Sequence, residues 1–220
     1  MYFEYYQKTK NAVRADHHFK KINSLVPELS KKHIMSFYIV QFLDSKLDKF
    51  LTDNNLEKLC DLNSELKENF DVDANEIYHA AVFKRFLAIC KFYEGDFSRA
   101  SKIMNELRNE ISLRNYPYFE VECKLFHALI YCLMGENELC NQLMVSISRQ
   151  IPPDDPHFEP VKLFIKLMKN SMKTTEFRQK IKKISEVWDQ FKESEKGNYN
   201  WLWFVKFDEV MIRRMANPMK

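Results

Sequence analysis

Apolar residues recur at intervals of three and four positions along most of the chain, which predicts α-helices. One such stripe consists of Phe177, Ile181, Ile184, Trp188 and Phe191. A second consists of Phe97, Ala100, Ile103, Met104, Leu107 and Ile111. Apolar and polar residues do not alternate over any stretch long enough to predict a strand. The pattern therefore predicts an all-α protein.

Prolines, glycines and short polar turns divide these periodic runs into about ten predicted helices. Pro27 is expected in the first turn of a helix, where its missing N–H does no harm. The three prolines within 151–156 end another helix. The connections are short, so neighbouring helices are expected to be antiparallel. The predicted helices are 3–24, 28–52, 55–69, 74–94, 96–113, 117–134, 136–150, 157–172, 174–193 and 198–215.

Glycine is scarce, and its placement supports a helical fold. The chain has only 3 glycines, whereas strand-rich and nucleotide-binding folds use glycine in turns and phosphate loops. Gly95, Gly135 and Gly197 each follow a helical run, where a left-handed C-cap favours glycine. We expect these residues to end helices.

The sequence contains an internal repeat, in which 82–119 aligns with 122–159. Six positions are identical between the two copies, among them Gly95 with Gly135. Ala100 aligns with Cys140, and Cys60 precedes Ala100 by the same interval. A small side chain at each of these positions would let the two helices of a hairpin approach closely. Looser copies are expected at 28–70 and 157–193.

The segment Glu94-Gly95-Asp96-Phe97-Ser98-Arg99-Ala100 resembles the turn between the two helices of a tetratricopeptide repeat. It has the turn glycine, an acidic residue, an aromatic residue and, three positions later, a small residue. Ala88, Ala128 and Tyr131 resemble the first-helix pattern of that family, and Pro152 resembles its closing proline. The period of 40 exceeds the family's 34, and Asn137 replaces an expected aromatic residue. The resemblance is clearest over 82–113 and 122–152.

This resemblance implies a right-handed superhelical stack of antiparallel hairpins, an α-solenoid in which each hairpin buries its apolar face on the next. We expect a single helical-repeat domain over 1–220. Its hairpins would be 28–70, 74–113, 117–151 and 157–194, followed by a capping helix at 198–215. Helix 3–24 would be either a solitary cap or the remaining part of a longer array.

Charge and cysteine usage favour a cytoplasmic protein. The net charge is +3, from 34 basic and 31 acidic residues, which gives no general electrostatic attraction to nucleic acid. The five cysteines are scattered within apolar helical stretches, so we expect them to be buried and reduced. The longest apolar run, 125–134, is about half of what a membrane-spanning helix needs.

No arrangement typical of an active site is present. Cys123 and His127 share a helix face, but no third ligand or orienting group accompanies them. Three isolated glycines cannot form a phosphate-binding loop. We therefore predict no enzymatic activity, no cofactor and no metal.

The resemblance also implies where a partner would bind, because the first helix of each tetratricopeptide hairpin lines the concave groove. The corresponding residues are Arg85, Ile89, Phe92, Tyr93, Glu122, Leu125, Leu129 and Leu133. This mostly apolar set suits an amphipathic helix or an extended peptide. The alternative is that the end helix of the chain, or a second copy in self-association, covers this surface.

A second candidate surface is a basic stripe on one predicted helix. It consists of Lys162, Lys166, Lys169 and Lys173, spaced for a single helix face. A solvated face is the ordinary interpretation of such a stripe. The alternative is a docking site for an acidic peptide, a membrane surface or a nucleic-acid backbone.

The function predicted from the sequence is a non-enzymatic scaffold that binds another protein or a peptide. One alternative is a sensor or regulatory repeat region of a larger multidomain protein, either signalling or transcription-regulating. Nucleic-acid binding through the basic stripe is a third, less favoured possibility.

Overall fold

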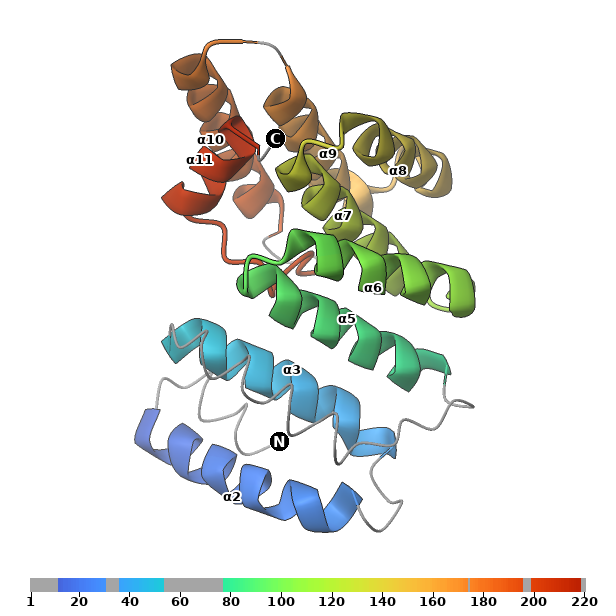
Figure 1. Cartoon of the computed structure of the whole chain (residues 1–220), viewed down its shortest axis with the longest axis vertical. Coiled ribbons are helices and arrows are strands. Elements are labelled where there is room, and N and C mark those ends of the chain that lie inside the picture. Colours follow the sequence, from blue (N-terminus) through green and yellow to red (C-terminus); the bar gives the residue numbers. More distant parts are fainter. Residues whose placement is uncertain (1–11, 31–35, 54–76, 174, 196–198, 219–220) are drawn as a thin grey trace. The chain divides into compact units, whose positions relative to one another are not determined.

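The computed structural model describes residues 12–30, 36–53, 77–173, 175–195 and 199–218. These residues form nine α-helices and one 3-10 turn, and no strand occurs among them (Figure 1). The prediction of an all-α fold is thus confirmed for the described chain. The helices are α2 (Ala12–Ser30), α3 (Ser36–Asp53), α5 (Ile77–Tyr93), α6 (Phe97–Glu110), α7 (Pro117–Met134), α8 (Asn137–Gln150), α9 (Glu159–Met172), α10 (Phe177–Ser194) and α11 (Glu209–Ala216), with the 3-10 turn η1 at Pro156–Phe158.

The chain divides into two compact units, 1–86 and 87–220, with the boundary inside α5. A single array over 1–220 stays a prediction, as does the right-handed superhelix. The predicted helix 55–69 and the small position at Cys60 lie outside the described residues.

In the first unit, α2 and α3 are joined by side-chain contacts. The rings of Phe19 and Phe50 meet edge to face, with centroids 6.3 Å apart. Lys49 of α3 lies 3.1 Å from the carboxylate of Asp16 on α2. The buried hydrophobic side chains among the described residues of this unit are Ala15, Phe42, Leu43, Leu47, Phe50, Ala81, Val82 and Phe86.

In the second unit, helices that follow one another in sequence are also neighbours in space. Helix α7 packs against α6, α8 and α9, and α9 packs against α10 and α11. Almost every side chain of α7 is buried, including those of Leu125, Leu129 and Leu133. α7 is therefore the central helix of this unit.

The turns after α5 and α7 have the same hydrogen bonds at aligned positions of the two repeat copies. Gly95 and Gly135 both have a left-handed backbone, with φ of 81° and 76°. The N–H of Asp96 bonds to the carbonyl of Lys91 at 3.0 Å, and the N–H of Glu136 bonds to that of Tyr131 at 2.9 Å. Together with the N–H bonds of the two glycines, this is the Schellman arrangement that ends a helix at glycine. Helices α6 and α8 then begin at the aligned residues Phe97 and Asn137.

The aligned small residues have equivalent surroundings. Ala100 and Cys140 are both completely buried in the first turn of the second helix of their hairpins. Their N–H groups bond to the carbonyls of Asp96 and Glu136, both at 3.0 Å. The structure therefore supports the predicted repeat for these two hairpins.

The N-terminal boundary at Pro27 was predicted wrongly. Helix α2 continues to Ser30, so Pro27 lies in its last turn and does not begin a helix. A proline near a helix end removes only one backbone hydrogen bond, and the helix can continue for a few residues. The predicted helix 3–24 corresponds to α2, and the first helix of the predicted hairpin 28–70 begins at Ser36.

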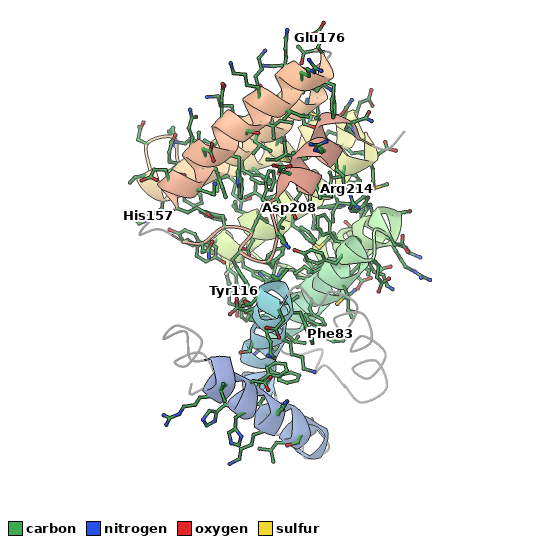
Figure 2. The ribbon with its side chains drawn as sticks, turned by 90° about the vertical axis from the view of Figure 1, so that its left-hand side faces the viewer. Phe83, Tyr116, His157, Glu176, Asp208 and Arg214 are labelled. Carbon is green, nitrogen blue, oxygen red and sulfur yellow. The ribbon has the colours of Figure 1, made fainter. Side chains whose placement is uncertain are left out.

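The predicted capping helix 198–215 is also shorter than expected. Only Glu209–Ala216 is helical, and residues 199–207 form an irregular segment that leads from α10 to α11 (Figure 1). The carboxylate of Asp208 accepts a 3.0 Å hydrogen bond from the N–H of Met211 and caps α11. Asp208 and Arg214 mark α11 in Figure 2. Leu202 has a positive φ of 54°, which no α-helix accommodates.

No described helix is long and apolar enough to cross a membrane.

Candidate functional site

The residues predicted to line the groove are mostly inside the protein. Ile89, Phe92, Leu125, Leu129 and Leu133 are buried among neighbouring helices. They contribute to the core and have no free surface for a partner.

Arg85 belongs to the first unit, where its guanidinium lies 3.1 Å from the carboxylate of Asp44 on α3. The side chain of Arg85 is only 4% exposed, so this ion pair is part of the interior of that unit. The other predicted groove residues come after the boundary at residue 86 and belong to the second unit.

Two of the predicted residues, Glu122 and Tyr93, hold the 199–207 segment. Glu122 on α7 is completely buried. Its Oε1 accepts a 3.2 Å hydrogen bond from the N–H of Leu202, and its Oε2 accepts one of 3.5 Å from the hydroxyl of Tyr199. The buried carboxylate is thus bonded to the backbone of a segment that is distant in sequence.

The hydroxyl of Tyr93 makes two hydrogen bonds to the backbone of the same segment. It donates to the carbonyl of Phe204 at 2.7 Å and accepts from the N–H of Lys206 at 2.8 Å. Burial is the main cause that raises the pKa of Tyr93 to about 12, so the hydroxyl is protonated at neutral pH and can donate.

Aromatic side chains complete the attachment of the segment. Phe204 meets Phe126 of α7 edge to face, with ring centroids 5.1 Å apart. Trp201 lies against Tyr118 and Phe158, with centroids 5.9 Å and 5.7 Å away. Its indole N–H donates to the carbonyl of His157 at 3.3 Å. Trp201 and Phe204 are among the most deeply buried large side chains of the described chain.

The surface formed by Tyr93, Tyr118, Glu122 and Phe126 is hereafter called the α5–α7 face. It binds an irregular peptide segment through three backbone groups and two buried aromatic side chains. The groove predicted from the sequence included Tyr93 and Glu122, and one alternative was that the end helix of the chain covers this surface. Residues 199–207, which belong to that predicted helix, do contact both side chains, but as an irregular segment. The apolar run Tyr199–Phe204 was the available signal, and it was interpreted as a helix.

Leu202 adopts a strained backbone at the centre of this contact. A left-handed conformation costs a non-glycine residue about 1 kcal/mol or more. Its side chain is 3% exposed and its N–H bonds to Glu122, so these contacts stabilise a conformation that an isolated peptide would avoid. The conformation of the segment therefore depends on the α5–α7 face.

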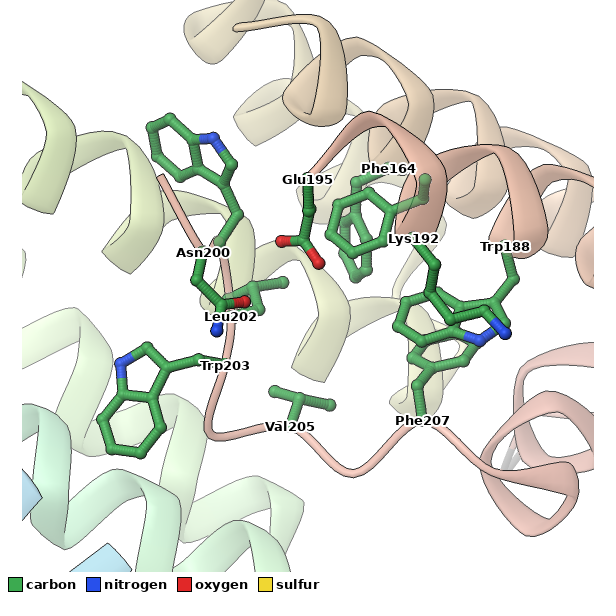
Figure 3. Close-up of a pocket in the computed structure, with 11 residues that line it drawn as sticks. Phe164, Trp188, Lys192, Glu195, Asn200, Leu202, Trp203, Val205 and Phe207 are labelled. Atoms are coloured by element: carbon green, nitrogen blue, oxygen red, sulfur yellow. The ribbon is translucent and has the colours of Figure 1, made fainter. Parts of the chain in front are cut away.

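A cavity of about 140 Å³ lies beside this segment. It is formed by α9, the C-terminal part of α10 and residues 200–207 (Figure 3). Its lining consists of Phe164, Trp188, Phe191, Lys192, Glu195, Asn200, Trp201, Leu202, Trp203, Val205 and Phe207. No residue predicted from the sequence as a binding residue lines this cavity.

Three lysines of the basic stripe lie on α9 and the fourth, Lys173, directly follows it; their surroundings differ. Lys162 is half-buried, lies 3.3 Å from the carboxylate of Glu159 and donates to the carbonyl of Pro153 at 2.6 Å. Lys173 donates to the amide oxygen of Asn170 at 3.1 Å. Lys166 and Lys169 are exposed.

Figure 2 shows side chains extending outward from α10, which begins beside the labelled Glu176.

The cysteine and histidine pair considered for metal binding is part of the core. Nε2 of the buried His127 lies 3.1 Å from the hydroxyl of Ser101. Burial is the main cause that lowers the pKa of His127 to about 3, so its ring is neutral. Cys123, the cysteine of this pair, is buried as well. Among the described residues, no three histidine, cysteine or acidic side chains are grouped so that they could hold a metal ion.

No protein-family model, curated protein or solved structure matched this chain.

Proposed function

We propose that this protein is a non-enzymatic scaffold whose α5–α7 face binds a peptide segment of a partner protein. The architecture proposed with it is a tetratricopeptide-like α-solenoid with right-handed superhelical twist. The repeated Schellman turns at Gly95 and Gly135 support that architecture.

The observation that carries the proposal is the way in which the 199–207 segment is held. Glu122 and Tyr93 bond to the backbone groups of Leu202, Phe204 and Lys206. Hydrogen bonds to the main chain supply affinity without selecting particular side chains, whereas pockets for alternate side chains supply specificity. The α5–α7 face therefore has the chemistry of a peptide-binding surface, and its present occupant belongs to the same chain.

The occupant defines the chemistry of the partner. Trp201 packs against the rings of Tyr118 and Phe158, and Phe204 packs against the ring of Phe126. Leu202, which lies between them in the sequence, is also buried. We expect the partner to supply an extended or irregular segment rich in large aromatic and aliphatic side chains. Aromatic side chains of this kind dominate the binding energy of protein interfaces.

Competition with the 199–207 segment sets how tightly a partner must bind. A tethered segment acts at an effective concentration on the order of millimolar. If the tethered segment has an intrinsic dissociation constant of about 1 μM for the face, a partner segment would then bind roughly a thousandfold more weakly than it would to the uncovered face. Weakening the tethered segment should restore the intrinsic affinity.

The test uses a synthetic peptide with the sequence of residues 199–207, labelled with a fluorophore and measured by fluorescence anisotropy. The protein is compared with its Trp201→Ala, Phe204→Ala double variant, after circular dichroism has shown that the variant retains its helices. We expect the double variant to bind the peptide and the unaltered protein to bind it at least tenfold more weakly. A matched peptide with alanine in place of both aromatic residues should not bind.

Equal binding of the two peptides to the double variant would contradict the proposal, as would no binding at all.

The structure also gives a reason to retain the second candidate function, a sensor or regulatory repeat region. A surface that is occupied by its own chain can exist in a covered and an uncovered state, and a ligand that prefers one state shifts the population. A change in amide exchange of 199–216 on addition of a physiological ligand would support this function, and unchanged exchange would contradict it.

A further inference from the structure

The cavity beside the 199–207 segment combines aromatic walls with a carboxylate. Six of its lining residues are aromatic: Phe164, Trp188, Phe191, Trp201, Trp203 and Phe207. Its volume is about 140 Å³, close to the roughly 150 Å³ of an engineered apolar cavity in another protein that binds benzene. A compact ligand with one ring, or an aliphatic body of similar size, fits this space.

Glu195, directly after α10, supplies the acidic group of the cavity. Figure 3 shows its side chain extending from the end of α10 toward Leu202, beside Phe164. The N–H of Trp201 bonds to its carboxylate. Its Oε1 is shielded from solvent and has no hydrogen-bond partner within the described part of the chain. Shielded polar atoms are nearly always paired in folded proteins, so this unpaired acceptor requires an explanation.

The electrostatic surroundings favour a positively charged donor. The carboxylate of Glu122 lies near enough to disfavour ionisation of Glu195, so two acidic groups share this part of the protein. The faces of aromatic rings carry negative partial charge and attract cations. An ammonium group would donate to Glu195, offset the repulsion between the two carboxylates and contact the ring faces.

We propose that this cavity binds a primary organic ammonium ion whose apolar body is about the size of a benzene ring, with its N–H groups donating to Glu195. A neutral ligand of the same shape lacks the charge that Glu195 and the ring faces attract. A quaternary ammonium ion has the charge but no N–H to donate to the carboxylate. The combination of ring faces and a carboxylate in the lining therefore favours a primary ammonium ion.

Other charged groups around the cavity do not oppose this assignment. Lys192 on α10 lies at the rim, with its ammonium 5.8 Å from the centroid of the Trp188 ring. It lies 3.1 Å from the carboxylate of Asp189, and its side chain is 53% exposed, so its charge is partly offset and directed toward solvent. From α9 the lining includes only Phe164, and from the segment 200–207 it includes only uncharged side chains. Glu122 is the charged neighbour contributed by α7.

The test is calorimetric titration of the full chain with benzylamine, benzyl alcohol and tetramethylammonium. Burial is the main cause that raises the pKa of Glu195 to about 7, so its ionised fraction rises from about one tenth at pH 6 to about nine tenths at pH 8. Benzylamine stays protonated over this range. We expect benzylamine to bind roughly tenfold more tightly at pH 8 than at pH 6, and more tightly than either comparison ligand at pH 8.

Two variants separate the role of Glu195 from a general effect of charge. Glu195→Gln keeps the shape of the side chain and should remove both the preference for benzylamine and its dependence on pH. Glu186→Gln removes the same charge from an exposed position on α10 and should leave binding unchanged. No binding of benzylamine, equal binding of benzyl alcohol, or an unaltered pH dependence in Glu195→Gln would each overturn the proposal.

Discussion

Replacing Tyr93 by phenylalanine removes one oxygen atom from the α5–α7 face and leaves the ring in place. The lost hydroxyl bonds to the carbonyl of Phe204 at 2.7 Å and to the N–H of Lys206 at 2.8 Å. The carbonyl is partly buried, so leaving it unpaired costs about 1–3 kcal/mol. The N–H is exposed and can bond to water, so its loss costs little.

We therefore expect Tyr93→Phe to lower the free energy of unfolding by about 1–2 kcal/mol. This loss cannot exceed the free energy of detaching the 199–207 segment, because the segment can detach while the helices remain folded. Detachment would expose Trp201, which is 1% exposed in the structure, and shift its fluorescence to longer wavelength. Urea denaturation followed by circular dichroism and tryptophan fluorescence measures both effects.

Tyr118→Phe is the matched control for this change. Tyr118 stacks on Phe158 with ring centroids 5.3 Å apart and is 38% exposed, so loss of its hydroxyl should change stability by less than about 0.5 kcal/mol. If Tyr93→Phe and Tyr118→Phe behave alike in stability and fluorescence, the hydrogen bonds of Tyr93 do not hold the segment.

Three further predictions concern the repeat and the core. Ala100→Leu and Cys140→Leu should each destabilise the protein by about 1–3 kcal/mol through overpacking, because both residues are completely buried. Lys102→Leu, at an exposed position, should not. Thermal denaturation of the three variants tests this, and a tolerated leucine at 100 or 140 would count against close helix approach. Gly95→Ala and Gly135→Ala should each lower the free energy of unfolding by about 1 kcal/mol, because both glycines have a positive φ that strains an alanine. No atom lies within 4 Å of a Cβ added at Gly95, so at that position the cost comes from the backbone alone. Matching losses for the two glycines are expected, and no loss at either would contradict the left-handed turns. The pKa of His127 is lowered from 6.5 to about 3, so between these values the unfolded chain binds a proton that the folded chain excludes. The free energy of unfolding should therefore fall by up to about 1.4 kcal/mol per pH unit as the pH drops from 6.5 to 3. Urea unfolding at several pH values should show a shallower fall for His127→Gln, and an identical slope would refute the assignment.

The helices and the repeat were predictable because they depend on short-range patterns. Apolar spacing identifies the buried face of α10, and glycine at 95 and 135 identifies a left-handed C-cap. Aligning the two turns with each other required only the printed sequence. The structure bears out these local features closely.

The 199–207 segment was not predictable, because its conformation depends on residues distant in sequence. The run Tyr199–Phe204 is almost continuously apolar, and such a run does not distinguish a buried helix from a buried irregular segment. The positive φ of Leu202 is stabilised by Glu122, which lies far earlier in the chain. The cavity at Glu195 was missed for the same reason, since much of its lining comes from this segment.

The central claim is that the chain covers its own peptide-binding face with residues 199–207. Nuclear magnetic resonance measurement of amide hydrogen exchange in the unaltered protein tests it most directly, at Leu202 and Lys206. Both N–H groups have acceptors on the α5–α7 face, Glu122 and Tyr93. We expect both amides to exchange far more slowly than in an isolated peptide of residues 199–207. Exchange at the rate of the isolated peptide, with the helices α7 and α9 still protected, would contradict it.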